Sequence, residues 1–289
     1  MKKKRITKPY NVDENDSRYY DSVNNGLPKT LKEKILSKHY LYSVIAQFFI
    51  GLAIAKKINY KFNCKKTFIT AFLISIPMSF MWGAYMAYSD PTYKGWFSMS
   101  FNSIGSIGYW SIEDCLFYPG AFVMFYFLYR WVQSWKLIDF KHSVFFKWVF
   151  FLSFLNLICF MLFFSHSCGV SLTLMFSVPG LAIMVCRWSK INFKTFIIYF
   201  IIMVVLEVVW DVSAVSFLRF WKGWAAGWRY LSFDANGVVH HSNVFMSYPK
   251  WWLFESPMEI TPYYAISGAP YAYLLIDILD QIFYGKKQI

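Results

Sequence analysis

The chain has 289 residues, of which 57% are hydrophobic, 22% aromatic and only 16% charged. Soluble domains carry about 25% charged residues, so this composition argues against a solvated globule, a disordered chain, a coiled coil and a collagen. The formal net charge of +13 does not indicate nucleic-acid binding, because the lysines and arginines lie before residue 39 or between apolar stretches. Loops that face anionic headgroups have this charge distribution. The composition therefore predicts an integral multi-pass membrane protein, with the lipid bilayer as a partner and no nucleic acid.

Residues 1–38 form a polar, basic tail, and residues 39–289 are predicted to be an all-α membrane domain. A spanning helix needs roughly 20 mostly apolar residues, and seven stretches meet or nearly meet that length. They run over Tyr40–Ala55, Thr67–Tyr88, Ile112–Val132, Trp148–Phe164, Val170–Cys186, Thr195–Phe217 and Pro257–Ile282. None of them has the polar face of a soluble-core helix. The first is short and could be re-entrant.

The predicted loops differ in positive charge, which sets orientation in a membrane. Lysines and arginines concentrate after the first, third and fifth helices, and the loop after the third carries Arg130, Lys136, Lys141 and Lys147. The loop after the second helix has only Lys94, and the loop after the fourth has none. The charged loops are expected to be cytoplasmic, which places the N-terminus outside, although the basic tail argues against that assignment.

An internal repeat is the most informative feature of the organisation. Lys66-Thr67-Phe68-Ile69 recurs as Lys194-Thr195-Phe196-Ile197, an offset of 194 − 66 = 128 residues. The same offset carries Trp82 onto Trp210, and Lys94-Gly95-Trp96 onto Lys222-Gly223-Trp224. We predict about seven helices in a parallel 3+1+3 repeat, with repeat 1 over about 40–133, a linker helix over about 144–165 and repeat 2 over about 168–284. The functional site is expected between the halves.

Six acidic residues lie within apolar helices or just at their start: Glu113, Asp114, Glu207, Asp211, Glu255 and Glu259. A carboxylate at mid-bilayer depth costs on the order of 3 kcal/mol, so such residues are commonly functional or paired. Glu207 and Asp211 are spaced i,i+4 and share a helix face. Two carboxyls in one apolar pocket cannot both ionise cheaply, so one is expected to be a neutral proton donor. The alternative is a single carboxyl that bonds to Trp or Tyr donors for packing.

Glu113, Asp114 and Glu259 have an equally simple structural interpretation. Each follows a serine that could cap a helix, and acids in a first turn stabilise the helix dipole without any chemistry. Aromatic residues flank the acids, and their π faces could stabilise a carbocation that water would quench. These candidate substrate-binding residues are Trp82, Tyr85, Trp110, Phe117, Trp210, Tyr263 and Tyr264. Simple packing in an aromatic-rich membrane core is the alternative.

Other chemistry has little support in the sequence. The chain has no G-x-G-x-x-G and no Walker loop, which argues against a nucleotide or dinucleotide cofactor. Its five histidines have no metal-ligand spacing, so no metal is expected. The five cysteines contain no C-x-x-C pair, and four of them sit in or beside apolar stretches, as packing residues do.

Several of these motifs resemble a known family. Trp210-Asp211, Trp228-Arg229-Tyr230 and Pro257-Met258-Glu259 resemble one half of the heterodimeric-type lycopene cyclases. Trp82, Trp96-Phe97 and the segment Ser111-Ile112-Glu113-Asp114-Cys115-Leu116-Phe117 resemble the other half, fused in a single chain. The resemblance covers roughly Tyr40 to Tyr284. It implies a proton-initiated, redox-neutral closure of a β-ionone ring at the end of a linear carotenoid, with no dinucleotide fold.

The resemblance also implies roles for individual residues. Glu113 and Asp114 match the acidic pair of the first half, Glu259 matches the first acid of the second half, and Asp211 matches the Trp-Asp acid. The chain departs from the family pattern at three positions. Gly83 occupies the first-half position equivalent to Asp211, Ser111 occupies the position of the first-half proline, and Ile260 occupies the position of a second acid. These departures leave the substrate open, and fungal meroterpenoid cyclases are a related-looking class.

The leading hypothesis is a membrane terpenoid cyclase that acts on a hydrophobic isoprenoid such as lycopene. Asp211, Glu113 and Glu259 are the candidate acid–base residues, and Glu207 and Asp114 are expected to tune them. The rival hypothesis is a small-solute transporter of the same 3+1+3 architecture. A non-catalytic membrane scaffold also fits the sequence, as does a homo-oligomeric state.

Overall fold

The computed structural model describes the backbone of residues 31, 39–61, 63–88, 97–100, 106–107, 110–138, 144–164, 178, 181–215, 228–233, 239–240 and 269–285. Its α-helices are α3 (His39–Lys57), α4 (Lys65–Tyr88), α5 (Ile112–Ser134), α6 (Val144–Phe164), α8 (Phe193–Val215) and α10 (Ala269–Tyr284). Residues 181–186 are also helical, and a short 3-10 helix, η1, covers Trp188–Lys190. The prediction of a helical domain is confirmed for the described residues.

The helices begin and end near the predicted boundaries. Five of them, α3, α4, α5, α6 and α8, coincide with predicted stretches to within a few residues. Residues 181–186 are the end of the stretch predicted over Val170–Cys186. Helix α10 covers the C-terminal part of the last predicted stretch, whose residues 257–268 lie outside the described part of the chain.

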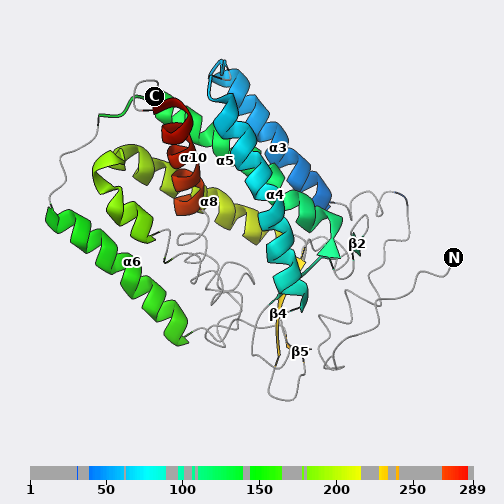
Figure 1. Cartoon of the computed structure of the whole chain (residues 1–289). Coiled ribbons are helices and arrows are strands. Elements are labelled where there is room, and N and C mark those ends of the chain that lie inside the picture. The colour runs from blue at the N-terminus through cyan, green and yellow to red at the C-terminus, as the bar shows by residue number, and fades with distance from the viewer. Residues whose placement is uncertain are drawn as a thin grey trace.

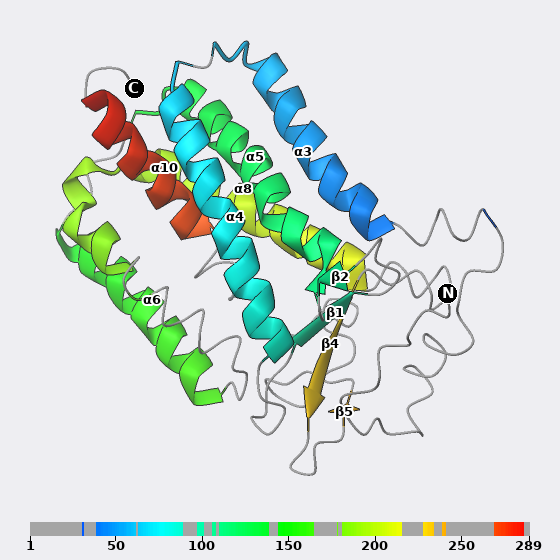
Figure 2. The same cartoon turned by 45° about the vertical axis from the view of Figure 1, so that its right-hand side comes forward.

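Helix α5 is the centre of the bundle. It packs against α3, α4, α8 and α10, and α4 and α8 in turn both contact α10 (Figure 1). Most of its side chains between Gly120 and Val132 are buried. Helix α6 lies to one side in both views (Figure 2). It attaches through Phe146 and Phe150, whose rings pack on Trp188 and Phe193.

Single asparagines define the C-terminal end of α3 and the N-terminal end of α8. Helix α3 ends at Lys57, and the chain then turns at Asn59, whose φ of 50° is left-handed, with the amide of Tyr60 donating to the carbonyl of Ala55. This is the Schellman arrangement, and asparagine tolerates its left-handed position better than most residues. At the start of α8, Asn192 Oδ1 accepts the amide of Thr195 at 2.9 Å, which is an N-cap. Both asparagines therefore define helix boundaries.

The described residues include five short strands in the connections between helices, which the all-α prediction did not include. Strand β1 (Phe97–Ser100) pairs antiparallel with β4 (Trp228–Phe233), and β4 pairs antiparallel with β5 (Val239–His240). Strands β2 (Ser106–Ile107) and β3 (Trp110–Ser111) form a second antiparallel pair just before α5. Large and small side chains alternate along Phe-Ser-Met-Ser in β1, the period of a strand. The alternation covers only four residues, too few to identify a strand from the sequence.

The register of β1 and β4 relates the two halves of the chain. Ser100 pairs with Trp228, and these positions are separated by the same number of residues as Lys66 and Lys194. Two copies of a segment that pair antiparallel at equivalent positions are related by a local two-fold axis through that pair. The repeated Lys-Thr-Phe-Ile motif also occupies the second to fifth positions of both α4 and α8.

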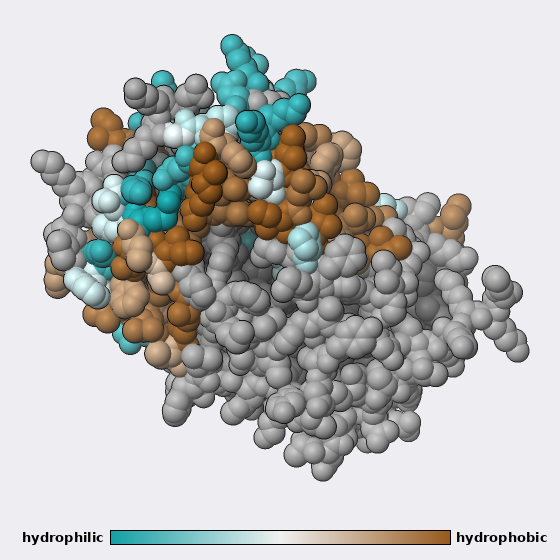
Figure 3. Space-filling model, viewed as in Figure 1, coloured by the Kyte–Doolittle hydropathy of each residue, from teal (hydrophilic) through white to brown (hydrophobic). Residues whose placement is uncertain are grey.

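Two segments of the described chain are long and apolar enough to cross a membrane, Cys115–Ser134 in α5 and Phe193–Trp210 in α8. Helix α6 contains a shorter apolar segment, Phe145–Cys159. Large hydrophobic side chains are exposed on the outer faces of α3, α6 and α8, such as Phe49, Phe145 and Val209. Figure 3 shows hydrophobic side chains gathered over α3 and over α6 on the face that it draws. The arrangement of seven spans stays a prediction.

The contact between α3 and α5 gives a testable prediction. A Cβ atom added to Gly51 would lie 2.9 Å from the backbone N and Cα of Met124, which cannot move without shifting α5. We expect Gly51→Ala to lower the free energy of unfolding by about 1–3 kcal/mol, the usual cost of overpacking. Thermal unfolding in detergent measures the effect. Ala53→Leu, at an exposed position of the same helix, is the control, and equal midpoints for the two variants would contradict the close crossing.

Candidate functional site

A buried carboxyl on α8 is the central feature of the candidate site. Glu207 is 8% exposed, and its Oε2 atom has no hydrogen-bond partner among the residues that the structure describes. Its neighbours Leu206 and Val209 are exposed on the other face of the helix. The Glu207 side chain therefore points toward the bundle and away from its apolar outer surface.

An aromatic pair lies one helical turn beyond this carboxyl. Trp210, three residues after Glu207, packs on Phe117 of α5 with ring centroids 5.6 Å apart and an interplanar angle of 40°. Both side chains are half-buried. The contact joins the first turns of α5 to the second half of α8, so it connects the two predicted repeats.

The remaining candidate residues fall at the same end of these helices or outside the described part. Glu113 and Asp114 occupy the second and third positions of α5, the predicted helix start, but their side chains are not described. Asp211 follows Trp210 in α8, one turn after Glu207, again with only its backbone described.

The aromatic candidates divide in the same way. Trp82 and Tyr85 lie in the C-terminal part of α4, and Trp110 lies in β3, in each case with the backbone alone described. Glu259, Tyr263 and Tyr264 lie outside the described residues. The structure thus brings together Phe117, Trp210 and the helix that carries Glu207.

This arrangement has a definite chemical capacity. A carboxyl group that is shielded from water favours its neutral form, because burial penalises the charged form. A neutral carboxyl can donate a proton, and neighbouring aromatic faces stabilise a cation through their quadrupoles. An acid beside aromatic rings is therefore suited to protonating an apolar substrate.

A second polar cluster, which the sequence analysis missed, lies at the opposite end of α5. The sequence analysis assigned Arg130 to a loop, but Arg130 lies inside α5 and is 5% exposed. Its two terminal nitrogens donate to both carboxylate oxygens of Asp280 in α10, at 2.6 and 2.7 Å. Arg130 and Phe117 are separated by about 20 Å along α5 at 1.5 Å per residue.

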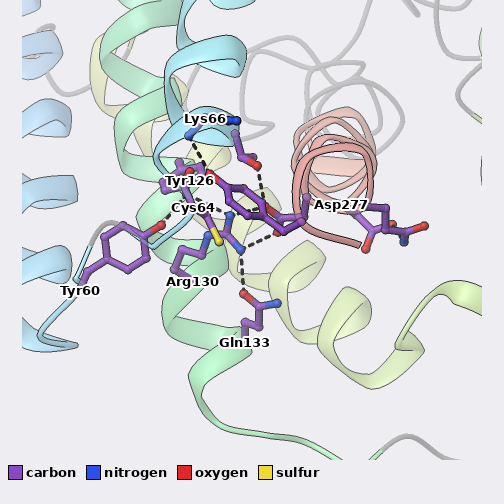
Figure 4. A network of polar contacts seen from close by, with 11 residues as sticks. Tyr60, Cys64, Lys66, Tyr126, Arg130, Gln133 and Asp277 are labelled. Carbon is purple, nitrogen blue, oxygen red and sulfur yellow. Dashed lines mark hydrogen bonds and ion pairs between the residues drawn. The ribbon is translucent and has the colours of Figure 1, made fainter. Parts of the chain in front are cut away.

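Further hydrogen bonds extend this ion pair to two other segments. Thr67 at the start of α4 donates to Asp280 at 2.7 Å. Arg130 also donates to the hydroxyl of Tyr126 at 2.9 Å, and that hydroxyl lies 2.7 Å from the hydroxyl of Tyr60 in the α3–α4 turn. Figure 4 shows Arg130 at the centre of these contacts. We call the group of Tyr60, Thr67, Tyr126, Arg130 and Asp280 the Arg130 network.

A parallel ion pair ties α10 to the segment before α8. Arg187 donates to Asp277 at 3.0 Å, and Gln281, one turn further along α10, donates to the same oxygen at 2.9 Å. Arg187 is less buried than Arg130, with 19% of its side chain exposed. Asp277 and Asp280 of α10 thus each form an ion pair with an arginine from a different segment.

Burial alters the acidity of groups in the α3–α4 turn. It raises the pKa of the Tyr60 hydroxyl, an effect that the hydrogen bond between Tyr60 and Tyr126 and the charge of Arg130 partly offset. Burial likewise raises the pKa of the Cys64 thiol, against the opposing charge of Arg130. Both groups therefore stay protonated at neutral pH, as members or neighbours of a hydrogen-bonded network.

Within the described part of the chain, no group of three or more His, Cys, Asp or Glu side chains could hold a metal ion. Comparison of the sequence with protein-family models finds no match, and comparison with curated proteins and with solved structures finds none either. The candidate site is therefore interpreted from its own residues and from the motifs of the sequence.

The Arg130 network gives a prediction about stability. Asp280→Asn leaves the guanidinium of Arg130 buried without a countercharge, and breaking a buried pair in this way costs about 3–5 kcal/mol. Asp277→Asn should cost less, because Arg187 retains contact with solvent. The double variant Arg130→Leu/Asp280→Leu removes both charges and should be more stable than Asp280→Asn. Unfolding in detergent ranks the three variants, and an Asp280→Asn protein as stable as Asp277→Asn would contradict the network.

The raised pKa of Cys64 gives a prediction about reactivity. In a variant that retains Cys64 as its one cysteine, alkylation by iodoacetamide requires the thiolate. Because burial raises the thiol pKa, the rate should rise at higher pH in the folded protein than in the same chain unfolded in guanidinium chloride. Mass spectrometry follows the modification. A folded-state profile at or below the unfolded-state profile would show that Cys64 is not shielded.

Proposed function

We propose that the chain is a multi-pass membrane cyclase that closes a ring in a linear isoprenoid by protonation. The observation that carries the proposal is the buried carboxyl of Glu207, without a described partner, one turn from the Phe117–Trp210 pair. Glu207 lies one turn before Asp211, the residue that matches the Trp-Asp acid in the lycopene cyclase resemblance. Lycopene is the substrate of the family that the motifs resemble, and the departures at Gly83, Ser111 and Ile260 leave the particular isoprenoid open.

The proposed reaction is redox-neutral and needs no cofactor. A carboxyl group donates its proton to a terminal alkene of the substrate, which leaves a tertiary carbocation and a carboxylate. A second alkene attacks the cation, so that one carbon–carbon bond forms and the charge moves into the new ring. Loss of a ring proton to a carboxylate restores an alkene, and the product is an isomer of the substrate. The roles of acid and base are shared among Glu207, Asp211, Glu113 and Glu259.

The aromatic residues have a separate part in this proposal. The faces of Trp210 and Phe117 stabilise the cation while the ring closes, and their apolar surface excludes water that would trap it as an alcohol. We propose that the substrate also contacts five further aromatic residues: Trp82, Tyr85, Trp110, Tyr263 and Tyr264.

We also propose that the seven predicted helices span a membrane in a 3+1+3 arrangement. The apolar exterior of α3, α6 and α8 supports this placement, because such a surface is stable against lipid and costly against water. The Ser100–Trp228 pairing supports the repeat, since it joins equivalent positions of the two copies. In such an arrangement the carboxyl of Glu207 lies between the halves, where repeat proteins of this type bind their substrates.

The proposal predicts the behaviour of single variants in a host that accumulates lycopene. Glu207→Gln and Asp211→Asn each remove a proton-transfer group and should reduce cyclic product by about 10²-fold or more. Leu206→Ala changes the exposed neighbour of Glu207 and should leave product formation nearly unchanged. Chromatography of a lipid extract detects a product of the same mass that absorbs at shorter wavelength, because the double bond of the new ring twists out of the plane of the polyene. Unchanged product in both acid variants would remove these carboxyls from the chemistry.

A small-solute transporter is the second candidate, and the ion pairs of α10 favour it. Arg130–Asp280 and Arg187–Asp277 join α10 to two other segments at one end of the bundle, and such pairs could open and close as the halves rock. The lipid extract separates the two candidates. Cyclic product supports the enzyme, whereas solute uptake without product supports the transporter.

A further inference from the structure

Exposed lysines gather at the end of the bundle that contains the Arg130 network. They belong to the end of α3, to the turn that follows it, to the start of α4 and to the segment after α5. We call them the basic rim: Lys56, Lys57, Lys61, Lys65, Lys66 and Lys136. Figure 3 shows hydrophilic side chains at this end, above the hydrophobic surface.

Contacts between distant segments place these lysines on one end. The ammonium group of Lys57 lies 4.8 Å from the ring centroid of Trp131, which joins the end of α3 to the end of α5. The backbone amide of Lys66 donates to the hydroxyl of Tyr284, which joins the start of α4 to the end of α10. The segments that carry the rim therefore meet at one end of the bundle.

The acids at this end do not neutralise the rim. Asp280 is fully buried and Asp277 is 7% exposed, and each is bonded to an arginine inside the bundle. Among the described residues, the charge that reaches the surface at this end is consequently the charge of lysines. The Arg130 network thus has an electrostatic effect as well as a structural one, because it confines the negative charge of α10 to the interior.

Apolar side chains stand directly beside the lysines. Trp135 precedes Lys136 and is 42% exposed, and Ile138 is 85% exposed. Long lysine stems beside exposed tryptophan are the pattern of a membrane–water interface, where the apolar part enters the lipid and the ammonium group reaches the headgroups. A nucleic acid would use the lysines but would gain nothing from Ile138.

We propose that the basic rim binds the anionic headgroups of the lipid leaflet that faces this end of the bundle. This inference rests on the proposed placement in a membrane but is independent of the cyclase chemistry. Each lysine near an anionic surface strengthens binding about fivefold, and the attraction falls off within a Debye length. The preference for anionic lipid should therefore depend on these side chains and weaken in high salt.

Reconstitution of the full chain in liposomes tests the proposal. Electron spin resonance of spin-labelled phosphatidylglycerol and phosphatidylcholine gives the association of each lipid with the protein relative to the other. We expect phosphatidylglycerol to be preferred about fivefold or more by the native chain. The preference should fall to near parity in Lys56→Gln/Lys57→Gln/Lys61→Gln/Lys65→Gln, and the matching set of Lys→Arg changes should retain it.

The outcomes separate this proposal from the others. Equal association of the two lipids with the native chain, or an unchanged preference in the glutamine variant, overturns the role of the rim. A chain that never enters the membrane fraction overturns the membrane placement itself. A lipid preference without any cyclic product leaves the rim assigned and removes the cyclase. Binding of a DNA oligonucleotide that the glutamine variant loses would assign the rim to nucleic acid instead.

Discussion

The bidentate ion pair between Arg130 and Asp280 is the contact on which the arrangement of the helix ends depends. Both side chains are almost completely removed from solvent, so each charge must be compensated inside the bundle. The pair fixes α5 against α10, while the bond from Thr67 adds α4 and the contact of Tyr126 with Tyr60 adds the turn after α3. One buried charge pair thereby sets the positions of α5 and α10 relative to each other and to the adjoining α3–α4 turn and start of α4.

The need to compensate a buried charge is met in a different way near the other end of α5. Glu207 is nearly as buried as Arg130, yet one of its carboxyl oxygens has no partner among the described residues. A carboxyl can avoid the cost of a buried charge by keeping its proton, an option that a guanidinium does not have. The bundle therefore combines a compensated charge at one end with a protonatable group at the other. Separation by most of the length of α5 lets stability and the proposed chemistry depend on different residues.

The sequence predicted the helices well because the length of an apolar stretch is a local property. It also identified Glu207 as an acid within an apolar helix, and Phe117 and Trp210 as aromatic residues near the acids. It could not identify the partner of Arg130, because Asp280 lies 150 residues away and no local pattern relates the two. Counting Arg130 as a loop charge concealed its burial, since α5 continues to Ser134. The short strands were missed because their alternation extends over too few residues to stand out in an aromatic-rich chain.

Differences between the two halves of the proposed repeat account for the separation of the Arg130 network from Glu207. Thr67 and Thr195 are equivalent by the repeat, but the side chain of Thr67 donates to Asp280, whereas the amide of Thr195 is capped by Asn192. The residue equivalent to Asp211 in the first half is Gly83. A scaffold with a local two-fold axis through Ser100 and Trp228 would offer two matching sites if its halves were identical. Because α8 carries both Glu207 and Asp211 and α4 has no acid at all, the two helices that the proposed repeat makes equivalent differ in their acids. In the proposed reaction α8 can therefore supply a proton that α4 cannot, whereas α4 contributes the bond from Thr67 to Asp280.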